Sequence, residues 1–246
     1  METFRALLTV DAEKFSTHRD ADLPGVHTEI RDAVERACRD SGLAETWRAV
    51  RFLESTGDGL LAALPHEAIP ALVHPFPARL QEALADAAPR LRARGLHLRL
   101  RAALHFGLVD DERPDAPGIS AAVTEVCRLV EAKPLRAALA DSHRDVTFVA
   151  FLVSAEVFAT YVQAGRTGLH ASRFTEVAVE VKQFARPAYL HVPVSSARGG
   201  GPPAKESSED APAPAVPSIS GVRISGARAQ VAFGNTVRGD LRQDRP

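Results

Sequence analysis

The acidic turn Gly57-Asp58-Gly59 constrains the fold of this chain most, because it separates two apolar runs, 48–53 and 59–64. Glycine gives the backbone freedom that a tight turn needs, so the pattern predicts a β-hairpin. Upstream, the apolar strand predicted over 6–10 ends directly at Asp11. Two adjacent strands that each present a carboxylate in this way are what a divalent metal ion needs.

Composition excludes several classes of protein. The chain has 246 residues, of which 45% are hydrophobic and 25% charged, and its formal net charge is −1. It therefore lacks the basic excess of a nucleic-acid-binding protein. No apolar run approaches the ~18 residues of a membrane span, and no secretory signal pattern is present, so we expect a cytoplasmic protein. Cys38 and Cys127 lie in predicted helices without a second metal-binding partner nearby, which is typical of buried structural thiols.

Hydrophobic periodicity predicts an alternation of strands and helices along most of the chain. The predicted strands cover 4–10, 48–53, 59–64, 97–109, 147–153, 174–181 and 188–192. The predicted helices cover 26–40, 66–92, 118–132, 134–140 and 155–163. This order indicates an α+β sandwich with helices packed on one central sheet.

Two motifs resemble the catalytic core of the class III nucleotidyl cyclases, the adenylate and guanylate cyclase domain. One is the strand that ends in Asp11 with Phe15-Ser16 four residues on, and the other is Glu54 followed by the Gly-Asp of the hairpin. The resemblance spans about residues 4–193. It implies a ferredoxin-like sandwich, with a central, mainly antiparallel sheet covered by helices.

The resemblance implies a metal and substrate site at these motifs. Asp11 and Asp58 match the family's two ligands for Mg²⁺ or Mn²⁺, and Phe15, Ser16 and Gly57 match positions beside the substrate. Carboxylate oxygens are the ligands that such hard cations prefer. The residues alone leave a plainer alternative open, in which Asp11 caps the following segment and Asp58 is a turn residue.

Glu54 matches the position where the family contacts the base. Guanylate-type members resemble this chain by having Glu there, and a carboxylate can accept hydrogen bonds from guanine. The resemblance therefore favours GTP as the substrate. The loop 110–117, where the second base contact should fall, departs from the family pattern, and an exposed glutamate at a strand end is the alternative.

The segment 101–109 resembles the family strand R-x-G/A-x-H-x-G-x-V, and we interpret its His105 as a core residue. The following helix resembles the stretch in which an Asn and an Arg reach across a dimer interface to the ribose and the reacting phosphate. Arg128 matches the Arg, and a guanidinium suits the charge that develops in the transition state. Thr124 stands at the Asn position, and its shorter hydroxyl cannot make the same contacts.

A second departure lies near residue 182. Active members of the family carry V-K-G-K-G there, with the second Lys on the phosphates, whereas this chain has Val181-Lys182-Gln183-Phe184. Lys182 is the candidate replacement, and Phe184 takes the place of the family's Lys. The resemblance thus implies a phosphorus–oxygen lyase that makes a 3′,5′-cyclic nucleotide. The competing hypothesis is a catalytically degenerate nucleotide sensor or scaffold.

One such domain per chain implies a homodimer with two symmetric sites, because the family's site forms between two domains. One domain gives the metal ligands and the other gives the Arg and Asn positions. A heterodimer with another cyclase-like chain would also serve.

The C-terminal part differs in character, so we divide the chain into a cyclase-like domain (1–194), a disordered linker (195–217) and a short β-prone segment (218–246). The linker holds almost no large apolar residue. Residues 230–235 loosely resemble the Gln/Gly/Asn core of amyloid signalling motifs related to the RIP homotypic interaction motif, which implies self-assembly or a protein partner. A hairpin docked on an edge strand and a disordered tail are the alternatives.

Overall fold

The structure, a computed structural model, describes residues 2–50, 52–110, 113, 118–181 and 184–196. Lys182, the linker from residue 197 onwards and the segment 218–246 lie outside the described residues. The predictions made for them therefore stay predictions, as does the three-part division of the chain.

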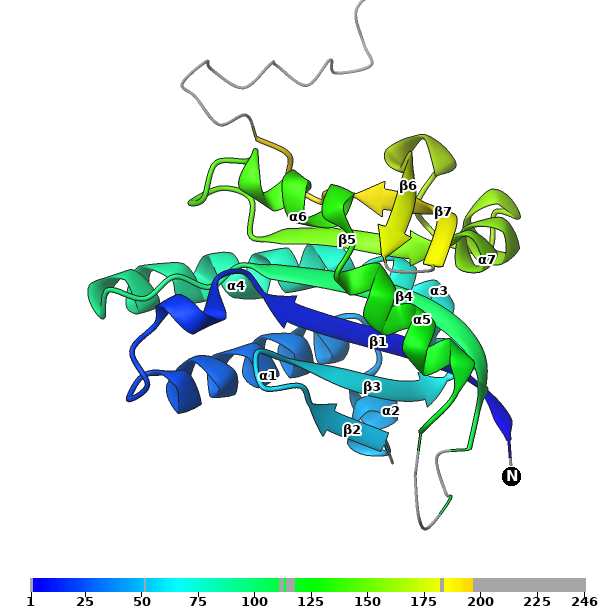
Figure 1. The fold of residues 1–246 in the computed structure, drawn as a ribbon, viewed down its shortest axis with the longest axis horizontal. Coiled ribbons are helices and arrows are strands. Elements are labelled where there is room, and N and C mark those ends of the chain that lie inside the picture. The colour runs from blue at the N-terminus through cyan, green and yellow to red at the C-terminus, as the bar shows by residue number, and fades with distance from the viewer. Residues whose placement is uncertain (1, 51, 111–112, 114–117, 182–183, 197–246) are drawn as a thin grey trace, which may run out of the picture. The chain divides into compact units, whose positions relative to one another are not determined.

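Within the described residues, seven strands form one sheet in the order β2-β3-β1-β4-β5-β7-β6 (Figure 1). Neighbouring strands pair antiparallel except β4 and β5, which pair parallel. The strands are β1 Thr3–Ala12, β2 Phe52–Ser55, β3 Gly59–Pro65, β4 Leu100–Val109, β5 Val149–Ser154, β6 Thr175–Val181 and β7 Phe184–His191.

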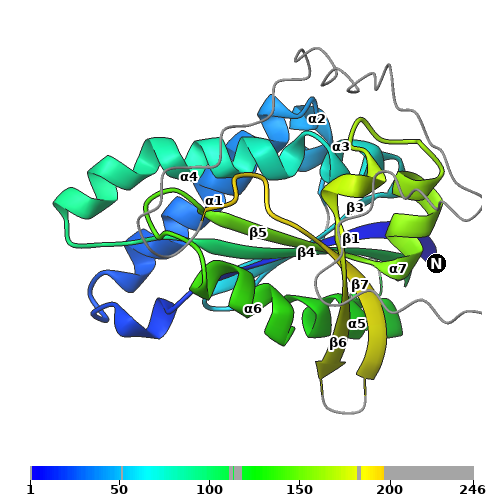
Figure 2. The same ribbon diagram turned by 90° about the horizontal axis from the view of Figure 1, so that it is seen from above.

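Helices cover both faces of the sheet (Figure 2). Helices α1 and α4 lie on one face, over a core that includes Leu8 and Val10, and α5 and α6 lie on the other, over a core that includes Leu7. The helices are α1 Leu23–Asp40, α2 Ala44–Arg48, α3 Ile69–Val73, α4 Phe76–Ala93, α5 Ala121–Val130, α6 Lys133–Ala140 and α7 Ala155–Val157, which continues as the π-helical turn η3 Phe158–Gln163. Short 3-10 turns are η1 Phe15–Thr17, η2 His66–Ala68 and η4 Ala171–Arg173.

Strand β1 is an interior strand of the sheet, third in its order, and most of its residues are buried. It pairs with β3 on one side and with β4 on the other over nearly its whole length. Because successive side chains of a strand point to opposite faces, Val10 packs beneath α1 and α4 while Leu7 and Asp11 lie on the α5–α6 face. The register of this one strand therefore fixes where the first predicted metal ligand lies.

The predicted α+β sandwich with a mainly antiparallel sheet is confirmed, but several boundaries were wrong. The strand predicted over 48–53 begins only at Phe52, because Ala44–Arg48 form the short helix α2. The helix predicted over 66–92 is divided into η2, α3 and α4, since the extended residue His74 precedes Pro75. The last strand, predicted over 188–192, runs from Phe184 to His191. In the described part of the chain, no helix combines the length and the apolar character that crossing a bilayer requires.

Candidate active site

The hairpin β2–β3 brings Asp58 against Asp11. Asp11 pairs with Gly59 in the register between β1 and β3, and the Ala12 N–H donates to the Asp58 carbonyl at 2.9 Å. The side chains of the two aspartates are themselves within hydrogen-bonding reach. The two carboxylates predicted to hold metal thus lie together in one chain.

Two glycines make this close approach possible. Gly57 has a φ of 90°, in the left-handed region that residues with a Cβ rarely adopt. A Cβ on Gly59 would lie 1.9 Å from the Val10 carbonyl oxygen, so only glycine fits between the hairpin and β1. The Gly-Asp-Gly sequence is therefore explained by the geometry of the site as well as by the turn.

The surroundings of Asp11 disfavour the charged form of its carboxylate. Its side chain is 17% exposed. Burial raises the pKa of Asp11 to about 7; the charges of Arg101 and Arg136 lower that pKa, whereas the hydrogen bond and the charge of Asp58 raise it further. Two partly buried carboxylates in contact repel each other when both are ionised, and a cation between them relieves that repulsion.

Arg101 is a site residue that the sequence reasoning missed. It faces Asp11 across the β1–β4 ladder and forms an ion pair with it, and its side chain is only 12% exposed. Its Nε is buried without a hydrogen-bond partner. The strand motif of residues 101–109 contained Arg101, but its contact with Asp11 depends on the register between β1 and β4.

The donor set fits a hard divalent cation. Asp11 and Asp58 offer carboxylate oxygens, which Mg²⁺ and Mn²⁺ prefer, and Mg²⁺ sites in proteins commonly use one or two carboxylates with substrate phosphates completing the shell. Beside this pair, the Nε–H of Arg101 has no acceptor, and a phosphate oxygen could accept its hydrogen bond.

The predicted substrate-binding residues flank the carboxylate pair in sequence. Phe15 and Ser16 lie in the turn η1 just after β1, where Phe15 packs against the α1–α4 core and Ser16 is exposed. Gly57 is exposed in the turn before Asp58. The structure brings these residues to the same end of β1, and their contact with a substrate stays a prediction.

Glu54 lies on the side of the hairpin that faces α5. It sits on β2 opposite Leu61 and is exposed. Burial raises the pKa of the Cys127 thiol in α5, and the charges of Glu131 and Glu54 raise it further, so Glu54 acts on that helix at short range. An exposed carboxylate at this place is free to accept hydrogen bonds from a ligand.

Thr124 and Arg128 lie one turn apart on α5, and the structure does not bring them to the carboxylate pair. The exposed Thr124 donates its hydroxyl hydrogen to the Ser120 carbonyl at 3.1 Å. The Arg128 guanidinium carbon lies 5.8 Å from the centre of the Phe184 ring. In the part of the chain that the structure describes, no contact joins either residue to Asp11 or Asp58.

The prediction that His105 is a core residue is confirmed, since it is 6% exposed, but it also belongs to a polar cluster. Its Nδ1 lies 2.9 Å from the Ser154 Oγ, and it shares with Glu125 and Glu156 a volume where all three ligand atoms are within 4.8 Å. Arg186 lies 3.2 Å from Glu156 and 3.8 Å from Glu125. Because this arginine already compensates both carboxylates, we interpret the cluster as an ion-pair network that ties α5 and α7 to the sheet.

The comparisons with known proteins support the fold. No known protein-family profile and no curated protein sequence matches the chain. Among solved structures, the adenylyl cyclase CyaB from P. aeruginosa superposes with a TM-score of 0.51 at 14% identity, over 80% of this chain and 97% of that one. A bacterial light-regulated adenylyl cyclase gives a TM-score of 0.52 at 13% identity, over 80% of this chain and 54% of that one. The described domain therefore has a fold similar to that of these adenylyl cyclase structures.

Proposed function

We propose that this protein is a nucleotidyl cyclase that converts a nucleoside triphosphate to the 3′,5′-cyclic nucleotide and pyrophosphate. One observation carries the proposal: the sheet register places Asp11 and Asp58 in contact, beside the buried cation Arg101. The cyclase fold of the neighbouring structures and the motifs at these positions support it.

The two aspartates are the proposed ligands for Mg²⁺ or Mn²⁺. A divalent ion held there would supply stabilisation of the negative charge that builds up on the reacting phosphate oxygens. Arg101 stands next to the pair and offers a fixed positive charge with a free Nε–H for a phosphate oxygen. On substrate binding, this guanidinium would exchange its contact with Asp11 for one with phosphate.

The remaining predicted residues are proposed to orient the substrate. Phe15, Ser16 and Gly57 flank the aspartates, and Lys182 is proposed as a phosphate contact. Glu54 would accept hydrogen bonds from the N1–H and 2-amino group of guanine, which favours GTP as the substrate.

The site is proposed to be completed by a second copy of the chain. Arg128 and Thr124 do not contact the aspartates of their own chain, yet Arg128 is the residue proposed to stabilise the transition state. An isologous dimer, in which each α5 serves the partner's aspartates, would give two equivalent sites.

The first experiment asks for the reaction itself. Purified protein is incubated with each of the four nucleoside triphosphates and Mn²⁺, and the products are identified by mass spectrometry. We expect a cyclic nucleotide from the wild type and from Asp32→Asn, a matched change at an exposed aspartate of α1, and none from Asp58→Asn. Absence of any cyclic product from the folded wild-type protein would overturn the proposal.

A second experiment tests the division of the site between chains. Asp58→Asn and Arg128→Ala chains are inactive alone if both residues are needed. After mixing and exchange, random pairing makes half of the dimers mixed, and each mixed dimer holds one intact site, so about a quarter of the wild-type activity should return. No recovery in a mixture shown to exchange subunits would exclude an intermolecular site.

A nucleotide sensor without turnover is the second candidate, and two observations favour it. Arg128 is engaged by the Phe184 ring of its own chain, and the Thr124 hydroxyl is used within its own helix. In this proposal nucleotide binding exposes the segment 218–246 for assembly. For such a sensor we expect nucleotide-dependent assembly that is lost when residues 218–246 are deleted, and no cyclic product at any stage. Light scattering measures the assembly and mass spectrometry detects the product, so together they distinguish the two candidate functions.

A further inference from the structure

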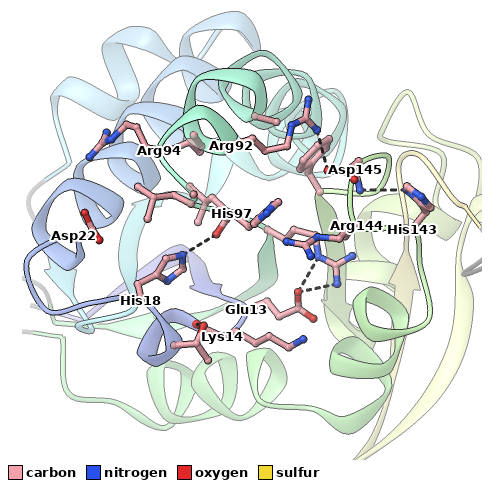
Figure 3. A pocket seen from close by; sticks show the side chains of 18 of the residues that line it. Glu13, Lys14, His18, Asp22, Arg92, Arg94, His97, His143, Arg144 and Asp145 are labelled. Carbon is pink, nitrogen blue, oxygen red and sulfur yellow. Dashed lines mark hydrogen bonds and ion pairs between the residues drawn. The ribbon is translucent and has the colours of Figure 1, made fainter.

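A pocket lies at the end of the sheet where β1 ends and β4 begins, separate from the aspartate pair. Its volume is about 850 Å³, and its walls come from the β1–η1 turn, the end of α4 with the following loop, and the connection between α6 and β5 (Figure 3). Neither Asp11 nor Asp58 lines it. Its volume is within the range of small-molecule sites.

The walls of the pocket carry an excess of positive charge. Six Lys and Arg side chains line it against three carboxylates. Each carboxylate is already paired: Asp22 with Arg19 at 2.8 Å, Asp145 with Arg92 at 2.9 Å, and Glu13 with Arg99 at 2.7 Å.

Three cations are left over: Lys14, Arg94 and Arg144. All three are exposed, and in the described residues none of them forms an ion pair. Figure 3 shows Lys14 and Arg144 on one side of the pocket, whereas the side chain of Arg94 extends to the opposite rim. Cations gathered around one concavity raise the local concentration of anions.

Two hydrogen bonds hold the ring of His18 in the wall of the pocket. Its Nδ1 lies 3.0 Å from the Phe15 carbonyl oxygen, and its Nε2 lies 3.1 Å from the His97 carbonyl oxygen. Nearby, burial lowers the pKa of His97, and the charge of Arg144 lowers it further.

The floor of the pocket is apolar. It is formed by Leu91, Leu96, Leu98 and Phe148, which are buried members of the α1–α4 core. An apolar floor below a cationic wall suits a molecule with an organic part and a strongly anionic part.

We propose that this pocket is a second ligand site, which binds a small molecule through a phosphate group with at least two negative charges. Lys14, Arg94 and Arg144 are the binding cations. Guanidinium groups bind phosphate through two parallel hydrogen bonds, which gives them geometric selectivity for this group. Binding at this pocket does not depend on cyclase chemistry at Asp11 and Asp58.

Calorimetric titration of the full-length protein in excess EDTA tests the proposal, because chelation removes divalent ions from the aspartate pair. The probes are inorganic phosphate, pyrophosphate, GTP, 3′,5′-cyclic GMP and uncharged guanosine. We expect pyrophosphate and GTP to bind, and guanosine not to bind. Equal affinities for pyrophosphate and GTP would assign the ligand to free polyphosphate, and tighter binding of GTP would assign it to a nucleotide.

The variant Arg94→Gln/Arg144→Gln should weaken this binding at least about tenfold, since two charge-assisted contacts are lost. Its matched control is Arg31→Gln/Arg166→Gln, which changes two exposed arginines outside the pocket and should leave the affinity unchanged. The proposal is overturned if no phosphate-bearing probe binds at millimolar concentration, or if the double variant binds as wild type.

Discussion

The aspartate pair and helix α5 carry the two sets of residues that the proposed reaction needs, and they are built in different ways. Asp11 and Asp58 are fixed by backbone pairing, because both belong to strands or turns in the register of β1. Arg128 is fixed by side-chain packing, since its guanidinium lies against the Phe184 ring. Backbone register tolerates little change, whereas a side-chain contact of this kind can be exchanged for another.

This difference indicates which part of the site is complete in one chain. The carboxylates and Arg101 are in contact before any ligand arrives. Arg128 would have to leave Phe184 in order to serve a neighbouring chain. Substitutions that disturb the aspartate pair and helix α5 separately would test this difference between them.

The largest effect should come from Gly59→Ala, which breaks the aspartate pair. The new Cβ would lie 1.9 Å from a backbone oxygen of β1, which no side-chain movement can relieve. We expect a loss of about 3 kcal/mol or more in the free energy of unfolding, measured by denaturant titration. Gly95→Ala is the control: it has a φ of 72° and open space around its Cβ, so backbone strain of about 1 kcal/mol is expected. Equal losses of unfolding free energy in the two variants would contradict the close approach of Gly59 to β1.

The next effect should come from Gly107→Ala, which disturbs the helix side. A Cβ on Gly107 would lie 2.5 Å from the Ala122 Cβ, so α5 must move away from β4. We expect a loss of about 1–3 kcal/mol, since the neighbour is a side chain on a helix that can shift. Metal binding to the aspartate pair, followed by Mn²⁺ electron paramagnetic resonance, should be retained. Loss of metal binding with the fold intact would mean that the two parts are not independent.

A smaller effect is expected from Phe184→Leu. Removing the ring releases Arg128 and, by loss of apolar contacts and the cation–π interaction, should lower the unfolding free energy by about 1–2 kcal/mol. If the protein is a cyclase, its turnover number should rise about 2–5-fold, because the free energy of one exposed cation–π contact corresponds to a rate change of that size. Phe158→Leu, at a ring stacked on Tyr189, is the control. Unchanged turnover in an active enzyme would show that Phe184 does not restrain Arg128.

The smallest effect concerns pH and the ion-pair network below α5. Burial lowers the pKa of His105, the charge of Glu156 raises it and that of Arg186 lowers it, with a net shift below the usual value. His105 therefore binds a proton more readily in the unfolded chain than in the folded protein. Its contribution to the free energy of unfolding is fully present above about pH 6.5, and it is lost as the pH falls through the pKa of His105 in the folded protein.

Thermal unfolding between pH 7.5 and 5 measures this dependence. His105→Gln should show a shallower decline of the melting temperature with acid than wild type, and the exposed His170→Gln should follow wild type. A decline in His105→Gln as steep as in wild type would exclude this histidine as a source of the acid sensitivity.

The sequence predicted the sheet and the position of the aspartates because both depend on local signals. A strand that ends in Asp11 and a glycine-flanked Asp58 are visible in single segments. Helix α2 was missed because its five residues are too short to show a helical period.

Arg101 and the pocket proposed to bind phosphate were missed for a different reason. The contact of Arg101 with Asp11 depends on the register between two strands about ninety residues apart, which no local pattern encodes. The pocket combines three connecting segments, and charged residues in loops ordinarily indicate only solvent exposure. The predicted roles of Glu54, Thr124, Arg128 and Lys182, the cytoplasmic location and the assembly of 218–246 stay predictions.

The central place of β1 has a consequence for how the protein folds. This strand comes first in the chain, yet its two partners, β3 and β4, follow roughly fifty and ninety residues later. Pairings this distant in sequence carry a high loop-closure entropy, so they form slowly and together with the rest of the sheet. Asp11 therefore meets Asp58 and Arg101 only once the sheet is assembled, and a chain still emerging from the ribosome before residue 100 cannot complete the site.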